Sequence, residues 1–339
     1  MGLSIKDIIK KEEISLEDLN GKIVAVDAFN VLYQFITTIR QHDGKPLMDS
    51  KGNVTSHLSG IFYRTTNMMS RGIKPVFVFD GEAPELKQKT REKRTAVKRD
   101  AQDKFDRAEN DEDKAKYASR ISYLTGEMID EAKEVIEALG LPVVQAPSEG
   151  EAQASFMVQQ GDAFAVASQD YDSLLFGAPR LIQNLTLAKT RKLPSGLSVA
   201  INPQMIELGK VMKELGLTRE QLICLGILVG TDYNPRGIPG IGQKTALKIV
   251  KQHKTPEEIF DEIGKEHELN FDWKAIFALF MKPKVIKDYK IKFNPINEEK
   301  LKEILVERHE FGEERISAAV KRAIEMKRAT EQKSIKKFF

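Results

Sequence analysis

Three short apolar runs have the pattern of buried parallel strands, and segments with helical periodicity separate them. The runs are Ile23 to Val26, Val76 to Phe79 and Ala163 to Ala167. An aspartate follows each run within one to three residues, namely Asp27, Asp80 and Asp170. Ligands of open α/β sheets bind beyond the carboxyl ends of the strands, so we expect these aspartates to share one crevice. The pattern predicts an α/β fold with a central, mostly parallel sheet flanked by helices.

A strongly polar stretch from Leu86 to Ser122 is too poor in large apolar residues to form core, and we expect helices that project from the sheet. Helical periodicity returns from Glu127 to Leu139, stops at Gly140 and resumes after Pro147. The expected organisation is an N-terminal region (1–105) with an insertion at 86–122, an internal region (123–255), a C-terminal helical part of the core (256–326) and a flexible tail (327–339).

Composition narrows the protein class without deciding the number of domains. The chain of 339 residues, 41% of them hydrophobic, can bury a large core. It has no apolar run long enough to cross a membrane, and its charged start does not fit a secretory signal. The single cysteine, Cys224, excludes an internal disulfide framework and a structural zinc site. A net charge of +3 gives only a weak indication of a nucleic-acid partner. We therefore expect a soluble, intracellular protein.

Seven acidic residues form the main candidate site: Asp27, Asp80, Glu149, Glu151, Asp170, Asp172 and Asp232. Singly, each has a simpler explanation. Asp27 can cap the helix that follows, and Asp80 can form a turn with Gly81. Ser148 and Glu151 fit the S-x-x-E capping box, which needs no catalytic role for the glutamate.

Together, these carboxylates are harder to explain as caps and turns. Two carboxylates about 4 Å apart repel by roughly 4 kcal/mol at an effective dielectric of about 20, so a cluster is costly without cations. Magnesium prefers carboxylate and water oxygens and leaves positions open for phosphate. Two such ions about 4 Å apart can activate a water and stabilise the leaving oxygen. The five histidines are scattered and form no competing metal site.

Five motifs that carry these carboxylates resemble flap endonucleases and the wider family of XPG-type nucleases, over nearly the whole chain. They are IVAVDA (23–28), FVFDG (77–81), APSEGEA (146–152), SQDYD (168–172) and GTDY (230–233). The resemblance implies a PIN-like nuclease fold and a magnesium-dependent enzyme that cuts DNA where a 5′ flap meets duplex, in replication and repair, including Okazaki fragment processing, with 5′–3′ exonuclease activity.

By the same resemblance, one Mg²⁺ is held mainly by Asp27, Asp80, Glu149 and Glu151, and a second by Asp170, Asp172 and Asp232, with Mn²⁺ able to substitute. Two other functions stay open. One is a related XPG-type nuclease or 5′ exonuclease with a different substrate geometry. The other is a non-catalytic scaffold for DNA junctions.

The polar stretch begins with basic residues at helical intervals, which can contact phosphates along a strand. These residues are Lys87, Arg91, Arg94 and Lys98. An ordinary solvated face is the alternative. The resemblance implies a helical arch at 86–122 through which the single strand passes. It also makes Lys87 and Arg94 the catalytic basic pair that steadies charge on the scissile phosphate.

Other DNA contacts rest on the resemblance alone. It implies that Tyr33 stacks on a base near the cut and that the helix from Gln34 to Arg40 wedges against the duplex junction. Core packing is the usual role of such a helix. Thr55 and Arg64 also match DNA-contact regions of the family.

The stretch from Gly237 to Thr245 nearly spells a phosphate-binding P-loop, but it has one residue too many and a predicted helix precedes it. We favour a helix-hairpin-helix element at 231–255. In this element Gly240 and Gly242 let a duplex phosphate approach the N-terminus of the next helix, beside Lys244 and Thr245. The resemblance implies a K⁺ ion at this turn. An ATPase is the alternative if the P-loop interpretation holds.

The tail matches the Q-x-x-hydrophobic-x-x-F-F peptide that docks on sliding clamps (PCNA). The matching residues are Gln332, Ile335, Phe338 and Phe339. Aromatic side chains in a tail expose apolar area unless a partner groove covers them, although accidental hydrophobes are the alternative. The expected partners are branched or 5′-flap DNA and the clamp, with no membrane, and we expect a monomer. An end at this motif favours an archaeal-like form, cytoplasmic if archaeal and nuclear if eukaryotic.

Overall fold

The computed structural model describes residues 5–41, 44–87, 124–186, 190–192 and 198–335, and the single positions 90, 97, 100, 103, 104 and 107. Side chains from 187 to 200 and beyond 326 are outside this description. Most of the expected arch at 86–122 lies outside the described residues, as do Arg91, Arg94, Lys98, Phe338 and Phe339. Within the described ranges, no helix is both long and apolar enough to cross a membrane.

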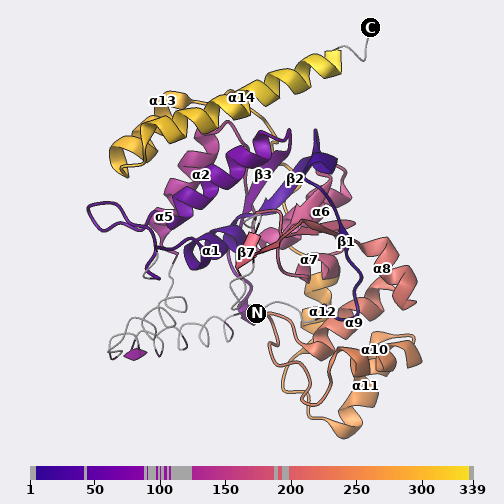
Figure 1. The fold of residues 1–339 in the computed structure, drawn as a ribbon. Coiled ribbons are helices and arrows are strands. Elements are labelled where there is room, and N and C mark those ends of the chain that lie inside the picture. The colour runs from indigo at the N-terminus through magenta and orange to yellow at the C-terminus, as the bar shows by residue number, and fades with distance from the viewer. Residues whose placement is uncertain are drawn as a thin grey trace.

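A seven-stranded sheet in the order β1-β9-β6-β5-β2-β3-β4 forms the centre of the molecule (Figure 1). Its strands are β1 (Glu12–Glu13), β2 (Ile23–Asp27), β3 (Lys74–Phe79), β4 (Val143–Gln145), β5 (Ala165–Ala167), β6 (Arg180–Gln183) and β9 (Gln204–Glu207). Strands β2 to β6 are parallel to one another. At one edge, β9 pairs antiparallel with β6, and β1 pairs antiparallel with β9. The predicted α/β fold with a mostly parallel sheet is confirmed, and the three predicted strands correspond to β2, β3 and β5.

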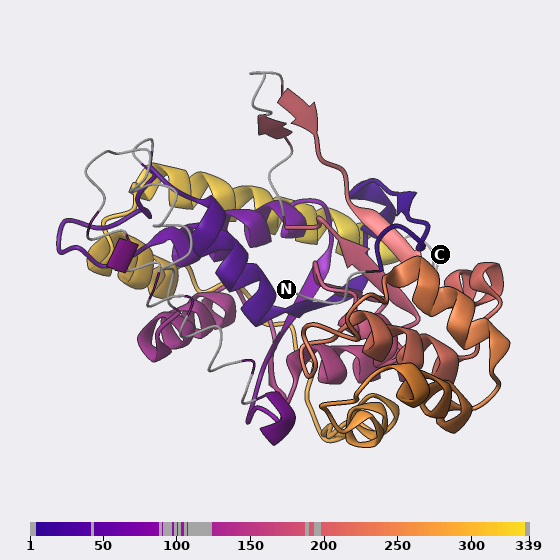
Figure 2. The same cartoon turned by 90° about the horizontal axis from the view of Figure 1, so that it is seen from below.

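Alternating side chains of β3 show why both faces of the sheet are covered. Val76 and Val78 belong to one hydrophobic cluster, whereas Phe77 and Phe79 belong to the other. A strand that is buried on both sides needs a continuous apolar run, which is the pattern in the sequence. A separate hairpin of β7 (Thr190–Lys192) and β8 (Ser198–Ala200) projects from the body of the molecule (Figure 2).

One face of the sheet is covered by helices from both ends of the chain (Figure 1). They are α1 (Ala28–Thr38), α2 (Ser56–Met69), α5 (Gly126–Ala138), α13 (Glu298–Leu301), the π-helix η3 (Lys302–Arg308) and α14 (Glu313–Ile335). Helix α14 packs on α2 and buries Ile316 and Val320. The helix continues to Ile335, so it crosses position 327, where the tail was expected to begin, and it includes the backbone of Gln332.

The opposite face carries the helices of the middle of the chain. They are α6 (Gly150–Gln159), α7 (Asp172–Leu175), α8 (Leu208–Leu215), α9 (Arg219–Val229), α10 (Gln243–Gln252), α11 (Pro256–Glu266) and α12 (Trp273–Met281). Their apolar side chains form a second core with Ile5 and Ile9. Cys224 lies in this core, as its apolar surroundings in the sequence suggested.

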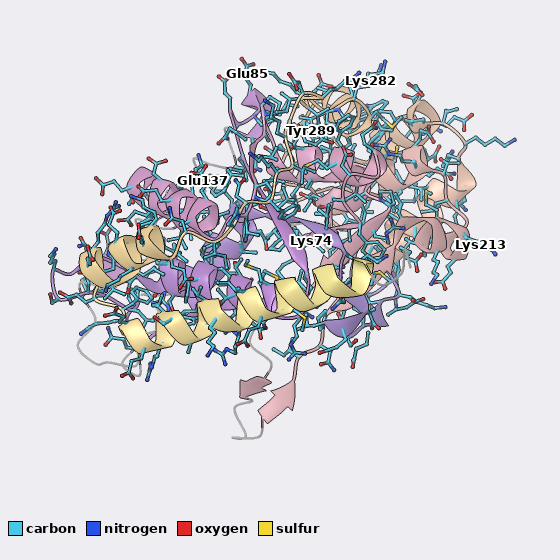
Figure 3. The ribbon with its side chains drawn as sticks, turned by 90° about the horizontal axis from the view of Figure 1, so that it is seen from above. Lys74, Glu85, Glu137, Lys213, Lys282 and Tyr289 are labelled. Carbon is cyan, nitrogen blue, oxygen red and sulfur yellow. The ribbon has the colours of Figure 1, made fainter. Side chains whose placement is uncertain are left out.

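An irregular strap, residues 282–297, connects the two helical layers (Figure 3). The Gln153 side chain on α6 bonds to both the N–H and the C=O of Ile286. Further along, the Asn294 N–H donates to the Gly140 carbonyl at 2.8 Å. Gly140 has φ +73°, and a Cβ there would lie 2.2 Å from the Asn294 carbonyl oxygen, so only glycine fits under the strap.

Two buried histidines share one glutamate on the face that carries α2. His309 lies with Nε2 at 2.8 Å from Glu131 Oε1 and Nδ1 at 3.1 Å from Asp49 Oδ2. His57 is fully buried, and its Nε2 lies 3.6 Å from the other oxygen of Glu131. Burial lowers the pKa of His57 below its usual value of 6.5, although Glu131 opposes this shift.

This lowered pKa predicts that folding stability falls in acid. Below pH 6.5 the unfolded chain binds a proton at residue 57 that the folded chain excludes, so stability is lost as the pH falls. The loss for one such proton is at most about 1.4 kcal/mol per pH unit. Urea unfolding between pH 5 and 8 should show a shallower acid loss for His57→Gln than for the unchanged chain or for the control His267→Gln, at a partly exposed position. Parallel profiles for all three would contradict this account.

Candidate active site

The sheet brings the three strand-end aspartates together. Asp27 ends β2 and also caps α1, because its Oδ1 accepts from the Asn30 N–H at 3.0 Å. Asp80 follows β3, and Asp170 follows β5 by three residues. Burial, together with the charges of Asp80 and Asp170, raises the pKa of Asp27 to about 8. Asp27 can therefore cap α1 and belong to the carboxylate cluster at the same time.

Helix α6 begins against Asp80. The Gly150 N–H donates to Asp80 Oδ1 at 2.7 Å, and a Cβ at position 150 would lie 2.6 Å from that oxygen. Glycine thus lets the helix N-terminus reach the carboxylate closely. Burial raises the pKa of Asp80, although this hydrogen bond and the charge of Lys87 oppose the shift.

The capping box suggested for Ser148 is wrong. Glu149 occupies the N-cap position of α6, and its side chain makes no capping hydrogen bond. The Ser148 hydroxyl instead donates to the Glu82 carbonyl at 3.0 Å. The side chain of Glu151, in the first turn of α6, is therefore not used for capping and faces the other carboxylates.

Serine hydroxyls hold Glu151 in place. Ser168 Oγ lies 3.0 Å from Glu151 Oε1 and 3.2 Å from Asp27 Oδ2, and Ser173 Oγ lies 3.2 Å from the same Glu151 oxygen. Burial raises the pKa of Glu151 well above its usual range, with further contributions from Asp27 and Asp172. Asp172 itself is buried at the start of α7. These groups form a dense patch of negative charge.

Asn30 connects this patch to helix α1. Its Nδ2 donates to Asp170 Oδ2 at 2.9 Å, and its Oδ1 accepts from the Gln169 N–H at 3.2 Å. Both ends of the amide are thus used to hold the turn after β5. The carboxylate of Asp170 keeps its orientation toward Asp27 and Glu151, whose pKa values it raises.

Lys87 lies among the remaining acidic residues. It ends the 3-10 turn η2 (Glu85–Lys87). Its Nζ is 2.7 Å from Glu149 Oε2 and 3.3 Å from Asp232 Oδ2. Burial raises the pKa of Glu149, whereas the lysine opposes the shift. All seven predicted carboxylates therefore lie in one region. Asp27, Glu151, Asp170 and Asp172 are linked through Ser168 or by mutual repulsion, and Asp80, Glu149 and Asp232 lie around Lys87. This grouping cuts across the partition between two metals that the resemblance implies.

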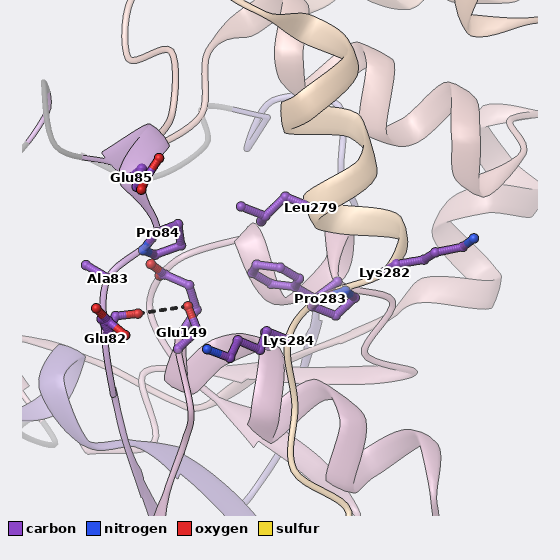
Figure 4. A pocket seen from close by; sticks show the side chains of 12 residues that line it. Glu82, Ala83, Pro84, Glu85, Glu149, Leu279, Lys282, Pro283 and Lys284 are labelled. Atoms are coloured by element: carbon purple, nitrogen blue, oxygen red, sulfur yellow. Dashed lines mark hydrogen bonds between the residues drawn. The ribbon is translucent and has the colours of Figure 1, made fainter.

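A cavity of about 380 Å³ lies beside Glu149 (Figure 4). Its walls include the Glu82–Glu85 loop, Phe176, Leu279 and the start of the strap at Lys284. Since a water occupies about 30 Å³ in the liquid, the cavity can hold several. Glu149 therefore borders both the carboxylate cluster and a space large enough for several water molecules.

The predicted DNA contacts on α1 and α2 differ in accessibility. Tyr33 is 38% exposed and can meet a ligand. Arg40 instead donates to the carbonyls of Thr37 and Gly44, so its guanidinium holds a loop of its own chain. Thr55 is buried, and burial lowers the pKa of the half-buried Arg64. Tyr33 is the strongest of these four candidates.

Helices flank the glycine-rich turn on both sides, with α9 before it and α10 after it. A P-loop needs a preceding strand, so the P-loop interpretation is wrong. Gly240 has φ +85° and Gly242 is the N-cap of α10, with open space at both positions. Lys244 and Thr245 are exposed in the first turn of α10. The geometry fits the helix-hairpin-helix element.

Comparisons with known proteins match this site and fold. Residues 1–101 match the XPG N-terminal domain and residues 140–232 match the XPG I-region. The chain is 53% identical to Flap endonuclease 1 of Hyperthermus butylicus, with 95% of this chain and 94% of the relative covered. It is 49% identical to Flap endonuclease 1 of Pyrococcus furiosus, with 100% and 99% covered. The chain belongs to the flap endonuclease family of XPG-type nucleases.

The solved structure of flap endonuclease-1 from Methanococcus jannaschii supports the same assignment. It superposes with a TM-score of 0.77 at 41% identity, over 96% of this chain and 98% of that one. The resemblance seen in the five motifs is confirmed, and so is the archaeal-like form. As a member of this family, the chain is a phosphodiester hydrolase.

Three polar residues of the site were missed from the sequence. Ser168 lies inside a motif but was not assigned a role, Asn30 follows Asp27 by three residues, and Thr90 falls in the polar stretch. Asn30 could have been found, since a residue three positions after a helix cap faces the capped end. Nothing in the sequence marks Thr90, because its partner is a backbone carbonyl 142 residues away.

Ser168→Ala should slow cleavage with little change in DNA affinity. The variant removes one hydroxyl shared by Asp27 and Glu151, and one lost hydrogen bond corresponds to roughly a five- to tenfold slower reaction. Single-turnover cleavage of a flapped DNA at saturating enzyme measures the step. Ser70→Ala, which removes a hydroxyl bonded to the Asn67 carbonyl at the far end of α2, is the matched control. Wild-type turnover in Ser168→Ala would show that the shared hydroxyl is dispensable.

Proposed function

We propose that this chain cuts DNA at the junction of a 5′ flap and duplex by two-metal-ion catalysis, in replication and repair. The observation that carries the proposal is the cluster of seven carboxylates, three of them buried and four partly buried, within a flap endonuclease fold. Removing so much charge from water without counterions is costly, and that cost is the reason for the raised pKa values of Asp27, Glu149 and Glu151.

The donor set fits magnesium. All seven side chains offer carboxylate oxygens, which are the ligands Mg²⁺ prefers, and Mn²⁺ accepts the same set. In the described part of the chain, no three acidic, histidine or cysteine side chains already surround one point closely enough to hold an ion. Binding of an ion by three or more of these side chains therefore requires the carboxylates to close in. When bound, two such ions would supply an activated water and neutralise charge on the phosphate.

The protein's own groups would position the DNA. Tyr33 is exposed on α1, the helix that Asp27 caps, and can stack on a base near the cut. Lys87, with Arg94, would steady the charge that develops on the scissile phosphate. The open turn at Gly240 and Gly242 presents the N-terminus of α10 to a duplex phosphate, and a K⁺ ion at this turn would neutralise that phosphate further.

Cleavage assays on four DNAs test this function. A 5′ flap, a bubble, a four-way junction and a blunt duplex are each supplied with Mg²⁺, and again with a chelator. We expect the 5′ flap to be cut fastest and the chelator to stop all cutting. A preference for bubbles or junctions would favour another XPG-type specificity, and cutting of blunt ends alone would favour a 5′ exonuclease. Metal-independent binding without cutting would indicate a scaffold.

Asp170→Asn should reduce cleavage at least about 100-fold while DNA affinity changes little. The substitution keeps an oxygen for the Asn30 amide but removes the charge that faces Asp27 and Glu151. Binding and cleavage of one 5′-flap DNA are measured separately. Asp288→Asn, at an exposed position on the strap, controls for the loss of a negative charge. Near-normal turnover in Asp170→Asn would remove this carboxylate from the metal site.

We also propose that the tail binds a sliding clamp (PCNA). Helix α14 reaches Ile335 and thus carries the first half of the Q-x-x-hydrophobic-x-x-F-F pattern away from α2. The two phenylalanines lie outside the described residues, and the proposal for them rests on the sequence pattern. A short helical segment followed by two aromatics suits an apolar groove on a partner.

Replacing Phe338 and Phe339 with alanine should leave cleavage of free DNA unchanged and abolish stimulation by the clamp, because the aromatic anchors are lost. Clamp affinity is measured by calorimetry, and cleavage is compared with and without clamp on the same flap. Replacing Lys336 and Lys337 with alanine is the control, since these positions lie between the pattern residues. Retained clamp affinity in the double phenylalanine variant would contradict the assignment.

A further inference from the structure

Lys87 is held inside the carboxylate cluster. Its side chain is only 14% exposed, and the two carboxylates it contacts are similarly buried. A surface lysine gains little from an ion pair because water screens it, whereas this one is largely removed from water. The Glu149 and Asp232 charges raise its pKa despite its burial, so the side chain stays a cation.

The backbone around Lys87 is fastened on both sides. Before it, the Gly81 N–H donates to the Ser148 carbonyl at 2.6 Å, and Ser148 donates back to the Glu82 carbonyl. After it, the Thr90 hydroxyl donates to the Asp232 carbonyl at 2.7 Å, and Thr90 is only 5% exposed. The chain that carries the lysine is therefore tied to Ser148, the neighbour of Glu149 in the sequence, and to Asp232 itself.

An ammonium ion and a divalent cation compete for the same carboxylate lone pairs. Lys87 Nζ contacts Glu149 Oε2 and Asp232 Oδ2, and a doubly charged cation bound to those oxygens would repel the ammonium group strongly. A metal that binds this pair of carboxylates therefore favours a Lys87 side chain that has moved away from them. The reverse holds by linkage: whatever keeps Lys87 in place weakens metal binding.

We propose that Lys87 is a built-in counterion that competes with a divalent cation for Glu149 and Asp232, and that Thr90 holds it in the competing position. Loading of the metal then frees the ammonium group at the site where the scissile phosphate arrives. This inference rests on the proposed two-metal function and adds an exchange step to it. It makes Thr90 a positioning residue, because it acts through Asp232 and the lysine.

Mn²⁺ binding to the full-length, DNA-free protein tests the exchange. Free Mn²⁺ is measured by electron paramagnetic resonance for the unchanged chain, Lys87→Met, Thr90→Val and Lys284→Met. We expect about tenfold tighter binding at one site in Lys87→Met, and a smaller tightening in Thr90→Val, which keeps the shape but not the hydroxyl. Lys284→Met removes the same charge from the exposed wall of the cavity beside Glu149 and should have little effect.

Equal or weaker Mn²⁺ binding in Lys87→Met would overturn the inference, and so would a tightening of the same size in Lys284→Met. These outcomes leave the proposed function intact as long as Asp170→Asn still loses Mn²⁺. Absence of Mn²⁺ binding in every variant, including the unchanged chain, would overturn the proposed function and the inference together.

A second readout uses the unchanged protein and so does not depend on how the variants fold. Lysines are acetylated with an amine-reactive ester, and the rate at each position is followed by mass spectrometry. We expect Lys87 to react slowly alone and faster with Mn²⁺, whereas the exposed Lys284 reacts at one rate throughout. A rate at Lys87 that Mn²⁺ leaves unchanged or slows would overturn the exchange.

Discussion

Mutual repulsion among buried carboxylates is the constraint on which the rest of this structure depends. Asp27, Asp80 and Asp170 are brought together because parallel strands end at one edge of the sheet, and four more acidic side chains join them from helices and loops. Each added negative charge makes the next more costly in a poorly hydrated place. The groups that surround the cluster reduce this electrostatic cost.

Three kinds of group reduce the repulsion among the carboxylates. Backbone N–H groups do so at the beginnings of helices, where Gly150 donates to Asp80 and Asn30 to Asp27. Hydroxyl and amide side chains do so where Ser168 and Asn30 hold individual oxygens. Lys87 supplies a full positive charge. The first two kinds are fixed by the fold, whereas the lysine side chain can exchange with another cation, which makes it the adjustable member of the set.

Much of this could be predicted from the sequence, because apolar runs and the aspartates after them follow local rules. Strands β2, β3 and β5 and helix α5 were found this way, and the seven acidic residues proved to be neighbours. Strands β4, β6 and β9 were missed, since each contains only two consecutive apolar residues, whereas the run that marks β5 has five. The capping box at Ser148 was predicted wrongly because its spacing to Glu151 fits the local pattern of a cap. Tertiary contacts give both side chains other partners, which the local pattern does not reveal.

The way α14 covers α2 has a consequence for how the protein is made. Ile61 and Phe62 of α2 lie in the same apolar cluster as Ile316 and Val320, more than 250 positions later. On the ribosome, this face of the sheet stays without its outer layer until residue 320 has emerged. The nascent chain must therefore keep the apolar surface of α2 from associating with other chains while more than 250 further residues are made, and α14 then completes the core around α2.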